Sequence, residues 1–323
     1  MSIFISHTSA LEYWRIHREA PALKAQRRKI ALPRRLTEAD IGLVEQLDGL
    51  KSPLHVMLGR AGARKVSRQA TAVRQHVFSS EVIGDCFVNC GEGLFVSSPE
   101  FVFLQLAAEL SLVKLILLGY ELCGRYSLGE EGASANDSAE ADSRGFDLRP
   151  PLTDTARIAA FLQRMTGVKG HKKATLALRY ISDNSLSPME TRLAILLTLP
   201  YRLGGYHLLK PKHNDRIVPV KTARNNVSKK YYECDLFWPD YDLAVEYDSD
   251  RYHTGASRIA EDAGKRNALA LMGITVITVT SQQFTSISEF EKVAQTIALC
   301  LNKRMQYKKE ALYKAQRELR RLL

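Results

Sequence analysis

One polar segment limits how this chain can fold. Residues 128–151, with the sequence LGEEGASANDSAEADSRGFDLRPP, hold six acidic residues and two arginines but few large apolar side chains. Such a segment cannot bury enough surface to offset its chain entropy, so it is typical of a flexible acidic loop or linker. The apolar residues on either side therefore have to form separate cores, and a length of 323 residues favours about two domains.

The helix and strand patterns differ on the two sides of this linker, and they predict a further division of the chain. Strand patterns at 53–58, 71–78 and 93–97 precede one long helical pattern at 98–123. The predicted parts are 1–127 (a basic α+β domain), 128–151 (the acidic flexible linker), 152–184 (a helical connector), 185–305 (a second domain) and 306–323 (a basic helical tail).

Helix and strand signals alternate in the second domain. A Ser-Pro start opens an apolar helical pattern, and the polar stretch Lys212–Asp215 predicts a turn between two strands. The order predicts a mixed sheet with helices on its faces, so we expect an α/β domain in a chain that is α+β overall. The expected elements are a helix at 187–199, strands at 207–210, 216–221, 231–238, 242–249 and 274–280, and helices at 257–272 and from 286.

The chain is strongly basic. It carries 46 Lys and Arg against 35 Asp and Glu, which gives a net charge of +11. The basic residues concentrate at 24–35, at 60–74 and in the tail. This excess favours DNA as a partner, and the alternative is a solvated cationic face. The residues expected to contact phosphate are Arg60, Arg64, Lys65 and Arg68.

The cysteines and the apolar runs indicate in which cellular compartment the chain is expected. The five cysteines are an odd number without a Cys-x-x-Cys pair, and the first fifteen residues lack a secretory signal pattern. Both features favour a reducing cytoplasm and argue against a structural zinc or a disulfide frame. The long apolar run 101–119 contains Glu109 and Lys114, so we expect a buried helix there and no membrane span.

Carboxylates gather on two neighbouring strands of the second domain. Strand alternation places Ala244, Glu246 and Asp248 on one face, and Asp235 precedes Glu246 by eleven residues on the strand before it. Three converging oxygen ligands suit a hard cation such as Mg²⁺ or Mn²⁺, which can activate water at a phosphodiester. The alternative is a set of solvated charges on an exposed sheet face.

The order of motifs around these carboxylates is itself informative. Four segments follow one another along the chain: CDLFWP, AVEYDSD, RYH and EDAGKRNALALMGITVITVT. This order resembles the very-short-patch-repair-like endonuclease domains of the PD-(D/E)XK nuclease superfamily, over about residues 185–305. The resemblance implies a restriction-endonuclease-like mixed sheet flanked by helices, no small-molecule cofactor, and Mg²⁺- or Mn²⁺-dependent hydrolysis of DNA.

The resemblance also implies roles for single residues. Asp235 and Glu246 would be metal ligands, Asp248 would assist directly or through water, and His253 would handle a proton. Asp248 stands where the wider superfamily usually has its lysine, and Ser249 stands where related domains generally have glycine.

Two further residues have two interpretations each. Many nucleases of this superfamily add an acid from the first helix, and Glu190 lies there, yet Ser187 and Glu190 also form the pattern of a capping box. Arg266 shares a helix face with Asp262, so it is expected either to face a phosphate or to form a surface ion pair. Both Glu190 and Arg266 are retained as site residues.

The first domain resembles a second family. The segments that carry this resemblance are ISHTSAL, SPLHVML, a basic run ending in VRQH, and GLFVSSPEFVFLQLA. Over about residues 1–125, the chain resembles the antitoxin-like regulators of the abortive-infection AbiE type. This resemblance adds a cognate toxin or a second protomer as candidate partners. The remaining histidines have neither metal-ligand spacing nor an acidic neighbour, so a structural role is expected for His7, His17, His55, His76 and His171.

The sequence thus predicts a metal-dependent endonuclease acting on DNA, in repair or in defence against foreign DNA. The first alternative is a DNA- or toxin-binding regulator whose nuclease fold lacks catalytic activity. A metal-free interaction protein is the second alternative. Cleavage of DNA that depends on Mg²⁺ or Mn²⁺ distinguishes the endonuclease from the other two.

Overall fold

The computed structural model separates the chain into two compact units. The first unit comprises Met1–Leu122 and Ser127–Arg179, and the second comprises Cys123–Tyr126 and Tyr180–Leu323. The residues predicted as a helical connector therefore belong to the first unit as far as Arg179. The structure describes residues 2–17, 30–36, 42, 49–59, 73–78, 84–129, 145–219, 229–248 and 256–323, without the side chains of 256–261.

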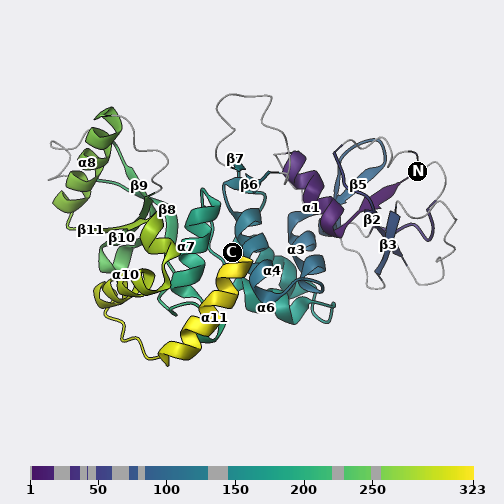
Figure 1. Cartoon of the computed structure of the whole chain (residues 1–323). Helices are drawn as coiled ribbons and strands as arrows, with labels where there is room; N and C mark the ends of the chain where they lie inside the picture. The colour runs from purple at the N-terminus through teal and green to yellow at the C-terminus, as the bar shows by residue number, and fades with distance from the viewer. Residues whose placement is uncertain are drawn as a thin grey trace. The chain divides into compact units, whose positions relative to one another are not determined.

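The first unit contains a mixed five-stranded sheet of order β3-β2-β1-β5-β4 (Figure 1). β2 and β3 run parallel, as do β1 and β5, while β1–β2 and β4–β5 are antiparallel. The strands predicted at 53–58, 71–78 and 93–97 are confirmed within a few residues. The strands are β1 (Ile3–Ile5), β2 (Leu54–Gly59), β3 (Val73–Phe78), β4 (Phe87–Asn89) and β5 (Leu94–Ser97).

Helices cover this sheet, and the helix predicted at 98–123 is two helices. Ser98 caps the first through its Oγ, which accepts from Phe101 N at 3.3 Å, and every residue of that helix is buried. Ser111 begins the second, because its Oγ accepts from Lys114 N at 3.4 Å. Among the described residues, no helix is long and apolar enough to cross a membrane. The helices are α1 (His7–Ile16), α3 (Pro99–Ala107), α4 (Leu112–Cys123), α5 (Thr155–Arg164) and α6 (His171–Leu178), with a 3-10 turn η1 (Gly84–Cys86).

The predicted acidic linker has ordered ends. β6 (Tyr126–Leu128) pairs with β7 (Phe146–Leu148) in a two-stranded sheet. Arg149 follows β7 and is only 5% exposed, and its guanidinium donates to the carbonyl of Glu121 at 2.8 Å. Residues 130–144 of the predicted linker lie outside the described residues.

The second unit is built on a mixed four-stranded sheet of order β11-β10-β9-β8. β10 and β11 are parallel, and the other neighbours are antiparallel. α8 and α10 lie on opposite sides of the sheet (Figure 1). The strands are β8 (Lys212–Ile217), β9 (Tyr232–Trp238), β10 (Leu243–Asp248) and β11 (Thr275–Thr280). The helices are α7 (Pro188–Thr198), α8 (Ala256–Leu271), α9 (Ser281–Thr285), α10 (Ile287–Cys300) and α11 (Lys309–Leu322), with 3-10 turns η2 (Tyr201–Leu203) and η4 (Pro239–Tyr241).

The expected mixed sheet with flanking helices is therefore present, and its core is apolar. Ala268 and Leu269 of α8 pack against Phe237 of β9 and Ala244 of β10. α8 ends where the sequence predicted, because Gly273 adopts a φ of 77° just beyond it. The overall class is mixed α/β, in an α+β arrangement.

Two details of the second unit differ from prediction. Lys212–Asp215 is not a turn but most of β8, and its Asn214 has a partner inside the unit: it donates to the carbonyl of Asn184 at 3.0 Å. Residues 207–210, predicted as a strand, form none. The basic tail is a helix, as predicted. A Cβ at Gly204, which follows η2, would lie 2.6 Å from the carbonyl oxygen of Ala315, so α11 comes close to the end of η2 at this glycine.

Candidate carboxylate site

The two carboxylates predicted as metal ligands lie where β9 and β10 part. The ladder between these strands continues as far as the pair Leu236 and Val245. Beyond it, Asp235 Oδ2 accepts from the backbone N–H of Tyr247 at 2.7 Å, so a side chain bonds the neighbouring strand. Asp235 is thereby fixed beside Glu246, the residue that precedes Tyr247 on β10.

Glu190 reaches the same site from the first turn of α7. Ser187 caps this helix as predicted, because its Oγ accepts from Glu190 N at 3.1 Å. The Glu190 carboxylate does not close a capping box on Ser187. Instead its Oε2 accepts from Leu186 N at 2.9 Å and from Asn214 Nδ2 at 2.7 Å. Asn214 holds this position with a left-handed φ of 47°.

Two of the three carboxylates, those of Glu190 and Asp235, have raised pKa values. Burial raises the pKa of Glu190 to about 7, and the charge of Glu246 adds to that shift. Burial, followed by the charges of Glu190 and Glu246, raises the pKa of Asp235 well above its ordinary value. Without a cation, Glu190 and Asp235 therefore take up protons more readily than ordinary acids.

Lys265 of α8 also belongs to the site, and the sequence reasoning missed it. Its Nζ lies 2.8 Å from Glu246 Oε1. Burial alone would lower the pKa of Lys265, but the charge and the hydrogen bond of Glu246, together with the nearby Cys234 and Asp235, outweigh burial and the net shift is upward. Helical periodicity could have identified it, since Lys265 precedes the sheet-facing residues Ala268 and Leu269 by three and four positions.

The other predicted catalytic residues are less well defined by the structure. Asp248 ends β10 opposite Thr280 and its side chain is half-buried, so its role in the site stays a prediction. His253 and Ser249 lie outside the described residues. Arg266 of α8 is exposed, next to Lys265, and its contact with phosphate stays a prediction.

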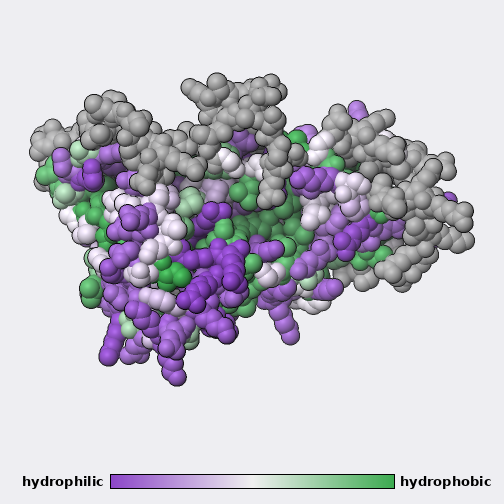
Figure 2. All heavy atoms as spheres, viewed as in Figure 1, coloured by the Kyte–Doolittle hydropathy of each residue, from purple (hydrophilic) through white to green (hydrophobic). Residues whose placement is uncertain are grey.

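The predicted phosphate contacts of the first domain also lie outside the described residues; they are Arg60, Arg64, Lys65 and Arg68. In the second unit, hydrophilic side chains gather over α11, as the space-filling view in Figure 2 shows. This surface and the turn before it form an exposed basic face, a further candidate for contact with phosphates. Its exposed basic residues are Arg304, Lys308, Lys309, Lys314, Arg317 and Arg321.

The donors at the carboxylate site suit a hard cation. Carboxylate oxygens are the ligands that Mg²⁺ prefers. Burial raises the pKa of the nearby Cys234, so this residue stays a neutral thiol and not a ligand. The carboxylate oxygens of Glu190, Asp235 and Glu246 do not all lie within 4.8 Å of one another. Among the described residues, His7, His55 and His76 are the only such group whose ligand atoms do.

Comparison of the chain with protein-family models, with curated proteins and with solved structures finds no match. The resemblances to endonuclease domains and to abortive-infection regulators consequently rest on the quoted residues.

Proposed function

We infer that this chain is a metal-dependent endonuclease that hydrolyses DNA phosphodiester bonds, in repair or in defence against foreign DNA. The observation that supports this proposal is the meeting of Glu190, Asp235 and Glu246, from α7, β9 and β10, with Lys265 of α8. Grouping carboxylates whose charges repel is unfavourable for folding, and groups with perturbed pKa values are typical of functional sites.

Each residue has a chemical role in this proposal. Asp235 and Glu246 would hold Mg²⁺ or Mn²⁺, which when bound activates water and neutralises charge on phosphate. Glu190 would orient the attacking water, because Asn214 fixes its carboxylate. Lys265 Nζ contacts Glu246 in the metal-free chain and would stabilise negative charge on a phosphate oxygen of bound DNA.

Asp248, at the end of β10, and His253, later in the chain, complete the proposed set of catalytic residues. Asp248 would assist the metal directly or through water, and His253 would transfer a proton to or from the reacting oxygen. DNA would be held by its backbone, through Arg266 and the basic face of α11, because phosphate contacts carry most of sequence-independent affinity.

The test is cleavage of plasmid, single-stranded and branched DNA during a titration with Mg²⁺ or Mn²⁺. Asp235→Asn and Glu246→Gln should each abolish cleavage, while DNA affinity in EDTA stays within a few-fold of wild type. Asp215→Asn is the matched control: Asp215 lies in the same sheet on β8, and its side chain is 38% exposed beside Lys212. It should cleave like wild type.

Normal cleavage by either site variant would show that the metal assignment is wrong. Binding of DNA by the wild-type chain with no cleavage of any substrate, at any concentration of either metal, would favour the regulator without catalytic activity. Loss of both binding and cleavage in the Asp215→Asn control would mean that the assay reports folding of the sheet and not its chemistry.

A further inference from the structure

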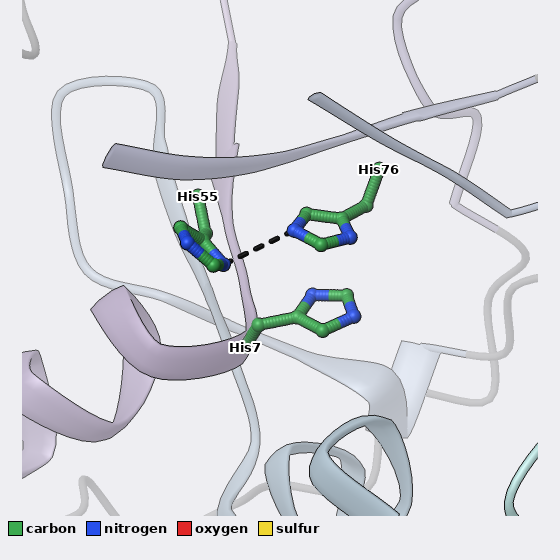
Figure 3. Close-up of side chains that lie close together, drawn as sticks. All are labelled: His7, His55 and His76. Carbon is green, nitrogen blue, oxygen red and sulfur yellow. Dashed lines mark hydrogen bonds between the residues drawn. The ribbon is translucent and has the colours of Figure 1, made fainter. Parts of the chain in front are cut away.

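Three histidines that are far apart in sequence meet in the first unit (Figure 3). His7 is the first residue of α1, His55 lies in β2, and His76 lies in β3. His55 Nδ1 and His76 Nε2 are 3.1 Å apart, and the rings of His7 and His76 stack with centroids 3.5 Å apart. One ring nitrogen from each histidine lies within 4.8 Å of the other two.

The three imidazoles are neutral, which is the form that binds metals. Burial lowers the pKa of His7 to about 3 and that of His76 to about 4, and it also lowers the pKa of His55. A neutral imidazole carries one N–H and one lone pair. Neutral imidazoles are preferred ligands of Zn²⁺ and of its neighbours Co²⁺, Ni²⁺ and Cu²⁺.

The backbone around the cluster is fixed by buried polar side chains. His7 N donates to Gln105 Oε1 at 2.9 Å, and Gln105 in turn donates to Ser97 Oγ at 3.1 Å. His55 N donates to Ser9 Oγ at 3.0 Å. These hydrogen bonds fix the backbone positions from which the rings of His7 and His55 project.

His7 also has an unusual backbone conformation. Its φ of 53° lies in the left-handed region, which is uncommon for a residue with a side chain. Residues in such conformations gather at active sites and ligand-binding sites. The ring of His7 stacks on the ring of His76, and its Nδ1 lies 3.0 Å from Ser6 Oγ.

We propose that His7, His55 and His76 bind one divalent transition-metal ion, Zn²⁺ by preference, with water in the remaining position. Three imidazoles and one open position are the ligand set of many zinc sites. Ligand nitrogens about 2.0–2.1 Å from Zn²⁺ in a tetrahedron lie about 3.3 Å apart, close to the 3.1 Å between His55 and His76. The stacked ring of His7 would rotate so that its lone pair meets the others.

Charged neighbours affect the site in opposite directions. Arg74 on β3 acts on all three histidines and disfavours a second cation, but its side chain is exposed and therefore screened by solvent. Glu109 favours positive charge at His55. The ion would connect α1, β2 and β3, so its binding would stabilise the first unit.

The experiment uses the full-length chain, stripped with EDTA and titrated with Zn²⁺ by calorimetry and with Co²⁺ by visible spectroscopy. Wild type should bind one Zn²⁺ in the first unit and give the intense Co²⁺ bands of a tetrahedral site. The titration is repeated in the Asp235→Asn, Glu246→Gln background, which removes the proposed site of the second unit. Binding that survives there belongs to the histidines.

Three variants make the result specific. His76→Gln should weaken Zn²⁺ binding on the order of 100-fold or more. His76→Phe keeps an aromatic ring against His7 and should lose binding while retaining a native circular-dichroism spectrum. His17→Gln is the matched control, because His17 is an exposed histidine of the same unit, and it should bind like wild type.

Equal Zn²⁺ affinity in wild type and in folded His76→Phe would overturn the proposal. So would a loss of all Zn²⁺ binding in the Asp235→Asn, Glu246→Gln background, because the ion would then occupy the carboxylate site. Neither outcome depends on DNA cleavage, so the histidine site and the nuclease proposal fail or succeed separately.

Discussion

Replacing Glu190 with glutamine tests the electrostatics of the carboxylate site directly. The hydrogen bonds from Leu186 N and Asn214 Nδ2 both end on one oxygen of the carboxylate, Oε2. The amide oxygen of glutamine can accept both, so Glu190→Gln keeps these hydrogen bonds and removes only the charge. Its NH₂ group would then be directed away from them, at the position of Oε1.

The expected magnitude follows from the pKa of Glu190, which is raised from 4.5 to about 7. A raised carboxyl pKa means that the folded chain binds a proton more tightly than the unfolded chain does, so wild-type stability falls as pH rises between these two values. The whole shift corresponds to about 3 kcal/mol. Metal-free Glu190→Gln should therefore be more stable than wild type above pH 7, by up to this amount, and equally stable below pH 4.5.

Urea unfolding in EDTA across this pH range measures the difference. Ser187→Ala is the control, because loss of the N-cap side chain should cost about 1 kcal/mol at every pH. In Mg²⁺, Glu190→Gln should cleave DNA more slowly although it is more stable. If Glu190→Gln is no more stable than wild type above pH 7, the carboxylate is not strained by its neighbours and the reasoning is wrong. Full cleavage activity in Mg²⁺ would make Glu190 a structural residue of the α7 start.

Three other perturbations have defined outcomes. Lys265→Met should lower the cleavage rate by about 100-fold or more while DNA affinity in EDTA is unchanged, because Lys265 would stabilise charge that develops in the reaction; an unchanged rate would remove Lys265 from the chemistry. Arg15→Ala should lower the free energy of unfolding by about 3 kcal/mol, since Arg15 forms two hydrogen bonds of 2.8 and 2.7 Å to Glu121, whose side chain is 2% exposed. Urea unfolding measures this decrease. A decrease below about 1 kcal/mol, as expected for an exposed ion pair, would contradict the prediction. Neutralising the four basic residues predicted to bind phosphate should flatten the salt dependence of DNA binding, by about 0.9 in log K against log salt for each phosphate that is no longer neutralised; an unchanged slope would place the binding surface elsewhere. The residues neutralised are Arg60, Arg64, Lys65 and Arg68.

The carboxylate site shows which features sequence reasoning can find. Alternation along β10 placed Glu246 correctly, and a hairpin argument brought Asp235 next to it, because both depend on neighbouring strands and short connections. Lys265 was not predicted. Asp262 and Arg266, which lie on either side of it, were considered instead because a spacing of four residues places them on one helix face. The sheet-facing side of α8 becomes evident only once Ala268 and Leu269 are known to be buried.

Two features elsewhere in the chain were not predicted, for a common physical reason. The strand β8 runs through a polar stretch in which Asn214 donates to the carbonyl of Asn184 and to Glu190, contacts that no local pattern records. The histidine cluster was missed for the same reason. His55 and His76 are 21 residues apart, and they meet only because β2 and β3 are parallel neighbours in the sheet.

Asn214 has a consequence for how this chain can vary in evolution. The residue satisfies two demands at once: a left-handed backbone, which glycine, asparagine and aspartate adopt most readily, and an amide that reaches both Asn184 and Glu190. Glycine would meet the first demand and not the second. In related chains, asparagine at this position should therefore accompany an acid at the position of Glu190, and glycine should become acceptable only where that acid is absent.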